Sequence, residues 1–167
     1  MKIGVVCSPG GHLTQALAIL EAFKDHDCFL VIQSFPSVKT FNPPQFKKTY
    51  HLKILFNYGF GIKITSSRYI WLGVYITLIE NMFELIKIFL KERPRVLFST
   101  GSEIAIPAFY IGKLLFGTKL IFLESITRIK DISFTGKVIM PIVDYFLVQW
   151  EDLSKKSKKA KFLGRII

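Results

Sequence analysis

Residues 2–12, KIGVVCSPGGH, contain the strongest fold signal in the sequence. The run from Lys2 to Cys7 has the length and apolar composition of a buried strand, and the turn Ser8-Pro9-Gly10-Gly11 ends it. From His12 to Phe23 the apolar residues recur at helical spacing. A strand that passes through glycines into a helix is typical of the first unit of a parallel sheet covered by helices.

The same alternation continues outward along the chain. We expect further strands at 28–32, 48–52, 95–99, 119–123 and 145–149, and helices at 69–91, at 103–116 and, as a short turn or helix, at 136–141. Because the residue before a proline avoids helical geometry, Arg93-Pro94 ends the longest helix. No repeat or linker divides the 167 residues. We therefore predict one domain over residues 1–167, an α/β fold of Rossmann type with a parallel sheet and helices on both faces.

The composition combines high hydrophobicity with a strong positive charge. Half of the residues are apolar, which excludes general disorder, and the formal net charge is +11. An anionic membrane surface or a phosphate-bearing ligand suits both properties. Nucleic acid would suit the charge alone, but the lysines gather in a tail instead of alternating with aromatic residues, and no nucleic-acid-binding motif is present. We expect no nucleic-acid partner.

The two cysteines, Cys7 and Cys28, both fall in expected strands. Isolated thiols in apolar runs are typical of core residues in a reducing compartment, and neither has a second cysteine or a histidine at metal-ligand spacing. The sequence begins directly with a strand and shows no signal peptide. We therefore expect folding in the cytosol, without a disulfide and without a metal site.

The helix expected at 69–91 is apolar around most of its circumference. Its apolar arc is about twice as wide as its polar arc, which is more than one sheet face covers. Charged residues such as Glu80 and Glu84 make a membrane-spanning helix unfavourable. A crowded core, a partner subunit and one membrane leaflet could each cover the arc. We favour the membrane, with these residues at the lipid: Tyr69, Trp71, Leu72, Tyr75 and Ile76. The lysines of 155–161 fit anionic lipid or a solvated patch equally well.

Three turns follow expected strands: SPGGH at 8–12, STGSE at 99–103 and ESITR at 124–128. In a parallel sheet such turns meet at the carboxyl edge, where ligands bind. Glycines let a ligand approach the backbone and a helix N-terminus attracts phosphate, although the same glycines also suit a tight turn that binds nothing. Thr100 or Ser102 suits a helix cap.

Glu124 ends an apolar run and should lie at the same edge. A carboxylate there fits a general base, a ligand for a substrate hydroxyl, or a structural partner of Arg128 or His12. The residue types alone favour the structural ion pair.

These turns belong to a longer pattern. It comprises ESITRIK at 124–130, SFTGK at 133–137, MPIVDYFLVQWEDL at 140–153 and FLG at 162–164, together with the earlier Gly-Gly-His and Thr-Gly-Ser. Over nearly the whole chain, the pattern closely resembles the asparagine-linked glycosylation protein 14 family and its bacterial and archaeal polysaccharide-biosynthesis relatives. The resemblance implies the acceptor-side half of a GT-B glycosyltransferase that is split over two polypeptides.

By this resemblance, the chain is a non-catalytic subunit, inactive alone, that docks peripherally on the cytoplasmic face of a membrane. A separate catalytic subunit, in a heterodimer or larger assembly, would hold the UDP-sugar, so no cofactor is expected on this chain. The acceptor would be a polyprenyl-diphosphate-linked saccharide, the transfer would invert, and the sugar in the eukaryotic branch is N-acetylglucosamine. The sequence departs from that branch because it shows no N-terminal transmembrane helix, so docking would depend on the 69–91 helix and on basic residues.

The resemblance also assigns roles to residues. Gly10, Gly11 and His12 would face the acceptor diphosphate, with His12 either a general base for the sugar hydroxyl or a structural residue. Apart from the resemblance, the position of Arg68 beside the 69–91 helix suits contact with a headgroup or the diphosphate. The cleft between the two chains would involve Thr100, Gly101, Ser102, Glu103, Glu124 and Arg128. The catalytic partner would contact Phe162, Leu163, Ile166 and Ile167.

A self-sufficient small nucleotide-sugar-binding enzyme is the alternative. It would need a base and ribose site within one domain, yet the dinucleotide fingerprint G-x-G-x-x-G is absent and no acidic residue clearly ends the second strand.

Overall fold

The computed structural model describes residues 1–33, 42–54 and 68–166, and describes side chains of its longest helix from Tyr75 onward. The strands are β1 (Lys2–Cys7), β2 (Asp27–Gln33), β3 (Lys48–Leu52), β4 (Val96–Ser99), β5 (Lys119–Leu123), β6 (Tyr145–Val148) and β7 (Ala160–Phe162). The helices are α1 (Gly11–Ala18), the 3₁₀ helix η1 (Leu20–Phe23), α2 (Arg68–Glu92), α3 (Ala105–Phe116), α4 (Phe134–Ile139) and α5 (Glu151–Ser154).

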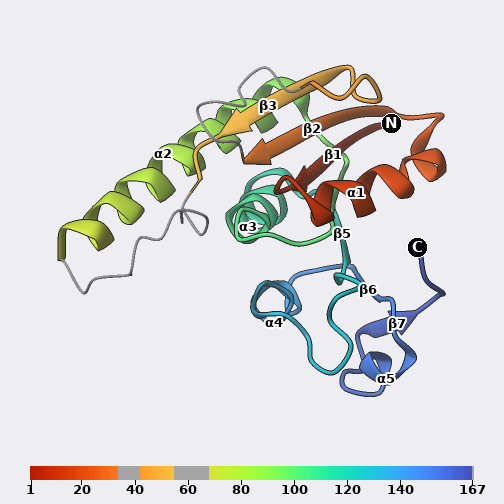
Figure 1. The fold of residues 1–167 in the computed structure, drawn as a ribbon. Coiled ribbons are helices and arrows are strands. Elements are labelled where there is room, and N and C mark those ends of the chain that lie inside the picture. The colour runs from red at the N-terminus through yellow and green to blue at the C-terminus, as the bar shows by residue number, and fades with distance from the viewer. Residues whose placement is uncertain (34–41, 55–67, 167) are drawn as a thin grey trace.

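The strands form one seven-stranded sheet in the order β3-β2-β1-β4-β5-β6-β7, and every pair is parallel (Figure 1). The chain starts in the middle of the sheet, builds outward to β3, and returns through α2 to place β4 on the other side of β1. This arrangement confirms the prediction of a Rossmann-type α/β fold.

Most expected elements are present within two residues of their expected ends, but the first helix and the tail differ. The helix expected from His12 to Phe23 ends as α1 at Ala18, and η1 follows with a tighter turn. In the tail, α5 and β7 form where the sequence predicts no regular element. Both are too short to show a hydrophobic period.

Alternation along the strands separates two cores. In β1, Val6 packs into the core beneath α2 and α3, whereas Val5 and Cys7 pack into the core beneath α1. Cys7 and Cys28 are buried and free, as expected. Helices therefore cover both faces of the sheet, and the loops at the strand ends are left to form sites.

One side of α2 keeps a row of exposed apolar side chains. Leu85 and Phe89 are fully buried against the sheet. Between 38% and 62% of each of the following side chains is exposed: Tyr75, Ile76, Ile79, Met82, Phe83 and Leu90, which we call the apolar stripe. The spacing of these six places them on one side of the helix, so the expectation that the sheet leaves part of the apolar arc uncovered is confirmed. Among the described residues, no helix has the length and hydrophobicity needed to cross a membrane.

Asn81 is a polar residue of α2 that the fold buries. This side chain is only 1% exposed. Its amide donates to the Lys53 carbonyl at 2.8 Å and its oxygen accepts from the Lys53 N–H at 3.1 Å. Asn81 is buried because it satisfies both backbone groups of Lys53, which lies just beyond the end of β3.

Glu92, the last residue of α2, joins the helix to two strands. Its carboxylate accepts hydrogen bonds from Lys2 at 2.8 Å, from Lys48 at 2.9 Å and from the Tyr50 hydroxyl. Burial alone would raise the pKa of Glu92, but the hydrogen bonds from Lys2, Tyr50 and Lys48 outweigh it and lower the pKa to about 2. Burial and the bond to Glu92 raise the pKa of Tyr50 to about 12.

Candidate functional site

The candidate site lies at the carboxyl edge of the sheet, between β1 and β4. These strands are neighbours, but the chain proceeds outward from them in opposite directions, to β2 on one side and to β5 on the other. Open α/β sheets bind ligands at such a reversal. The turns at 8–12 and 99–103 both lie there, as the parallel topology predicts.

His12 and Thr100 hold these two turns together. The Nδ1 atom of His12 donates to the Thr100 carbonyl at 2.8 Å, and the Thr100 hydroxyl donates to the His12 carbonyl at 2.7 Å. Since a carbonyl can only accept, the proton of the neutral imidazole is on Nδ1, and Nε2 has its lone pair available. Within the described residues, Nε2 makes no hydrogen bond.

Gly101 has no room for a side chain. A Cβ there would lie 2.6 Å from Cε1 of His12. Its φ of +119° also lies in the region that favours glycine. The imidazole of His12 therefore packs directly on the backbone of the second turn.

Ser102, the next residue, also has a positive φ, 106°, which is strained for a residue with a side chain. Its hydroxyl donates to Oε1 of Gln33 at 3.1 Å and accepts from the Ile104 N–H at 3.4 Å. Gln33 ends β2 and is buried, and among the residues that the structure describes its Nε2 has no hydrogen-bond partner. Helix α3 has Ile104 as its N-cap and no side-chain cap, so the capping role expected of Thr100 or Ser102 is wrong. The hydrogen bond to Gln33 instead holds Ser102 in its strained conformation.

The start of α1 offers backbone N–H groups to the same place. Gly10 and Gly11 are exposed, and a Cβ on either would meet nothing within 4 Å. No side chain caps the helix, whose first turn begins at Gly11. Free amides at a helix N-terminus favour an anion.

A buried glutamine pair connects the third turn to the other two. Gln15 of α1 donates to the Gly11 carbonyl at 3.1 Å, and its Oε1 accepts from the Ile126 N–H at 3.0 Å. Gln149 donates to Oε1 of Gln15 at 2.7 Å and to the Glu124 carbonyl at 3.0 Å. The three turns are therefore one hydrogen-bonded unit.

Glu124 has backbone and hydroxyl partners instead of the ion pair that the residue types favour. Its carboxylate accepts from the Ser125 N–H at 3.0 Å and from the N–H and hydroxyl of Ser133 at 2.9 and 3.0 Å. The side chain is 1% exposed, and Gly136 leaves the space that it fills. The ion-pair prediction is wrong because neither Arg128 nor His12 contacts this carboxylate; it instead fastens the loop that leads to α4.

The remaining predicted residues are distributed around the site. Glu103 is half-buried and Arg128 is exposed. Leu163 is 80% exposed and Phe162 37%. Ile166 packs on the core beneath α1, and its N–H donates to Gln149 at 3.3 Å. The side chains of Arg68, Tyr69, Trp71 and Leu72, and all of Ile167, lie outside the described residues.

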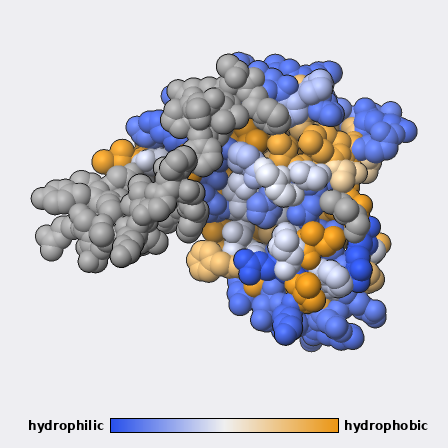
Figure 2. Space-filling model, in the orientation of Figure 1, coloured by the Kyte–Doolittle hydropathy of each residue, from blue (hydrophilic) through white to orange (hydrophobic). Residues whose placement is uncertain are grey.

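The lysine-rich segment is partly engaged by the protein itself. Lys155 pairs with Asp152, Lys156 with Asp131, and Lys159 donates to two carbonyls, those of Met140 and Pro141. The end of the molecule formed by α5 and β7 has a hydrophilic surface (Figure 2). These contacts favour the interpretation of a solvated patch over that of a lipid-binding tail.

Sequence reasoning did not identify Gln15, Gln33, Gln149 or Ser133. The three glutamines depend on partners far along the chain, such as Gln149 on Gln15, and Ser133 depends on Glu124 in the turn before it. The only local signal was an amide at the end of an apolar strand, Gln33 after CFLVI and Gln149 after YFLV. Buried amides at strand ends require hydrogen-bond partners, so this signal points to a network.

Comparisons with known proteins show the family of the chain. The family model described as "Oligosaccharide biosynthesis protein Alg14 like" matches residues 3–166. The chain is 34% identical over 112 residues to the UDP-N-acetylglucosamine transferase subunit ALG14 of Debaryomyces hansenii, a stretch that covers 64% of this chain and 46% of that protein. It is 25% identical to the human subunit of the same name over 180 residues, covering 100% of this chain and 83% of the human protein.

Solved structures support the fold. MurG of Acinetobacter baumannii superposes with a TM-score of 0.67 at 15% identity, over 97% of this chain and 45% of MurG. UDP-GlcNAc 2-epimerase of Methanocaldococcus jannaschii superposes with a TM-score of 0.64 at 16% identity, over 99% of this chain and 46% of the epimerase. The chain thus corresponds to about half of each of these proteins.

Proposed function

The chain belongs to the Alg14 family of oligosaccharide biosynthesis proteins, and from that premise we propose that it is the acceptor-binding, membrane-docking subunit of a two-subunit glycosyltransferase. The donor would be a UDP-sugar, most simply UDP-N-acetylglucosamine, the sugar nucleotide in the names of its relatives. The acceptor would be a saccharide linked to a polyprenyl diphosphate.

The observation that carries the proposal is the position of His12 between an uncapped helix N-terminus and the turn after β4. The amides at the start of α1 and the exposed Gly10 and Gly11 suit the diphosphate of the acceptor. Thr100 orients the imidazole beside them through two hydrogen bonds. The acceptor diphosphate and the imidazole of His12 would then be held by neighbouring residues, so that both could contact one sugar-diphosphate acceptor.

In this account His12 is the general base. With its proton on Nδ1, its Nε2 can accept the proton of the acceptor hydroxyl while that oxygen attacks the anomeric carbon of the donor. The bond between that carbon and the UDP oxygen breaks on the opposite side, so the configuration inverts and UDP leaves as the anion. Glu124 has a positioning role in this account, because its carboxylate is enclosed by Ser125 and Ser133 and fastens the loop that leads to α4.

Membrane docking would use the apolar stripe of α2. Side chains such as Ile79 and Phe83 are 53% and 62% exposed. Single exposed apolar residues are common, but a row of six along one helix marks an interaction surface. A helix that lies in the membrane interface has this form. Charged neighbours, including the exposed pair Lys87–Glu84, would face water beside it.

The donor would be held by a separate catalytic chain. MurG and the epimerase have about twice the length that this chain matches, and strand β2 ends in the buried Gln33 instead of an acidic residue suited to a ribose. Exposed Phe162 and Leu163 and the exposed Arg128 would contribute to the surface that meets the partner.

A reconstituted transfer assay tests the proposal. Purified chain, the catalytic chain encoded beside it, a polyprenyl-diphosphate-linked acceptor and labelled UDP-N-acetylglucosamine are combined, with each chain also assayed alone. We expect labelled lipid only when both chains are present. Transfer by this chain alone would overturn the split enzyme and favour a self-sufficient nucleotide-sugar enzyme.

A further inference from the structure

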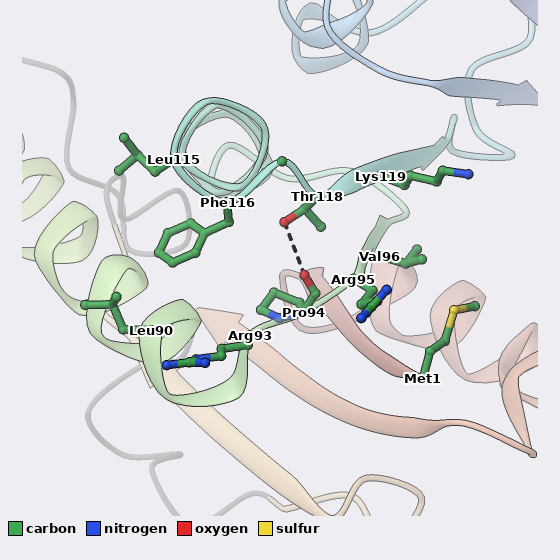
Figure 3. A pocket seen from close by; sticks show the side chains of 11 residues that line it. Met1, Leu90, Arg93, Pro94, Arg95, Val96, Leu115, Phe116, Thr118 and Lys119 are labelled. Carbon is green, nitrogen blue, oxygen red and sulfur yellow. Dashed lines mark hydrogen bonds between the residues drawn. The ribbon is translucent and has the colours of Figure 1, made fainter.

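A second feature with ligand-binding character lies at the amino edge of the sheet, opposite the candidate site. A hollow of about 790 Å³ is bordered by the ends of α2 and α3 and by the residues that open β1, β4 and β5 (Figure 3). Its polar lining includes Arg93, Arg95 and Lys119, and its apolar lining includes Leu90, Leu115 and Phe116. We call it the basic hollow.

The three cations of the basic hollow are exposed and form no ion pair among the described residues, and Lys119 is near enough to Asp144 to help lower the pKa of that carboxyl. Within the described part of the chain, no carboxylate pairs with Arg93, Arg95 or Lys119, and their side chains make no hydrogen bond. Elsewhere many lysines have carboxylate partners, as Lys113 has in Asp144 at 2.7 Å. Three unpaired cations around one concave surface attract an anion.

Arg93 is held at the hollow in an unfavourable conformation. It follows the last residue of α2 with a φ of +48°, and its N–H donates to the Phe89 carbonyl at 2.8 Å. At the same place after α3, the chain has Gly117, with a φ of +61°. Glycine is the usual residue there because a side chain is strained. An arginine that is kept in this strained conformation indicates that its guanidinium has a function.

The apolar side of the hollow continues the apolar stripe. Leu90 is 59% exposed, ends the stripe and lines the hollow, and Leu115 of α3 is 62% exposed. In Figure 3, Leu90, Leu115 and Phe116 gather on the side of α2 and α3, whereas Arg95 and Lys119 lie toward the strands. The surface therefore combines an anion-binding end with an open apolar end, which is the chemistry of an amphiphile.

We propose that the basic hollow binds the phosphate headgroup of an anionic phospholipid whose acyl chains contact Leu90, Leu115 and the rest of the stripe. The proposal rests on the proposed membrane docking and specifies its lipid class. The stripe would lie in the acyl region, with the cations at headgroup level at its end. Because Glu92 bonds Lys48 at the start of β3 and Asn81 bonds Lys53 just beyond its end, the stripe would run along the membrane from the basic hollow to the carboxyl edge, where the lipid-linked acceptor would bind.

Vesicle flotation tests the proposal. The full chain is incubated with vesicles of phosphatidylcholine alone and with vesicles that contain one-fifth phosphatidylglycerol. The test variant is Arg93→Gly/Lys119→Gln, in which glycine relieves the strain at position 93 and protects the fold. The control, Lys24→Gln/Lys47→Gln, removes the same charge from exposed lysines elsewhere.

We expect the chain to prefer anionic vesicles and the test variant to bind them about 25-fold more weakly, since each cation near an anionic surface contributes a factor of about five. The control should bind within about threefold of the unaltered chain. Equal binding of both variants would overturn the headgroup site while docking through the stripe stands. No binding of the unaltered chain to any vesicle would overturn both. Loss of catalytic-chain binding in the test variant, with vesicle binding unchanged, would assign the hollow to a protein partner and overturn the lipid proposal.

Discussion

His12 and Thr100 exchange two hydrogen bonds across the carboxyl edge of the sheet, at 2.8 Å from the imidazole and at 2.7 Å from the hydroxyl. The two residues are 88 positions apart, and the pairing joins the helix after β1 to the turn after β4. It also fixes which imidazole nitrogen carries the proton. The proposed general base is thus positioned by the fold before any ligand binds.

Replacing Gly101 with alanine should displace the imidazole of His12. The new Cβ would lie 2.6 Å from Cε1 of the ring, which is closer than atoms pack. We expect kcat/KM for the acceptor to fall about 100-fold in the reconstituted enzyme, as a misplacement of about 1 Å can cause.

Gly117→Ala provides the control for Gly101→Ala. Gly117 also has a positive φ, but a Cβ there meets nothing within 4 Å. Both variants should lose about 1 kcal/mol from backbone strain, and Gly101→Ala should lose more because its Cβ overlaps the His12 ring. Thermal unfolding measures both losses, and only Gly101→Ala should lose activity. If the two variants were equally active, His12 would not be the general base.

Glu124→Gln distinguishes a structural from a catalytic carboxylate. An amide has a single accepting oxygen, so it cannot accept from Ser133 and from the Ser125 N–H at once, as the two carboxylate oxygens do, and a buried donor would lose its partner. We expect a loss of about 2 kcal/mol in the free energy of unfolding, measured by urea denaturation.

Ser133→Ala removes one of these bonds and the cap of α4, so it should cost about 1 kcal/mol. Unchanged stability of Glu124→Gln, together with abolished turnover, would instead assign Glu124 to the reaction.

The Glu92 cluster predicts how stability depends on pH. The pKa of Glu92 is lowered from 4.5 to about 2 in the folded state, so the unfolded chain binds a proton first as the pH falls. The contribution of Glu92 is complete above pH 4.5 and is lost progressively as the pH falls toward 2.

Glu92→Gln should therefore lower the free energy of unfolding at pH 7 by about 2 kcal/mol and flatten its decline between pH 4.5 and 2. The measurement is chemical denaturation at a series of pH values. A decline as steep as that of the unaltered chain would contradict the assignment.

The apolar stripe predicts membrane affinity apart from charge. Ile79→Ser and Phe83→Ser remove exposed apolar surface without disturbing the buried Leu85 or Phe89. Each should weaken binding to neutral vesicles about tenfold, because a buried side chain of this size contributes about 1.5 kcal/mol or more. Glu84→Ser, on the polar side of the same helix, should leave flotation unchanged, and an equal loss in all three would argue against an inserted stripe.

The order and type of most elements could be predicted because each strand and long helix has its own hydrophobic period. The β1 run ends at glycines, and α2 ends before Pro94, so local rules suffice there. The tail could not be predicted in this way. β7 has three residues, and it forms because β6 offers an open edge, which is a tertiary cause.

The location of the site in the fold could be predicted from the sequence, but its side-chain contacts could not. Parallel strands bring the turns at 8–12 and 99–103 to one edge, and the sequence indicates both. The partners of Glu124 and Asn81 could not be read from residue types, because both bind backbone groups that become unpaired only in the folded chain. Charge patterns suggested ion pairs, whereas the buried N–H groups determined the partners.

The most direct test of the central claim is the affinity of the chain by itself for each substrate. Isothermal titration would compare a short-chain polyprenyl-diphosphate-linked N-acetylglucosamine with UDP-N-acetylglucosamine, on the unaltered chain and on Gly101→Ala. The account predicts that the chain binds the acceptor, that Gly101→Ala weakens this binding, and that UDP-N-acetylglucosamine binds at least tenfold more weakly than the acceptor. Tighter binding of the UDP-sugar than of the acceptor would contradict an acceptor-side subunit.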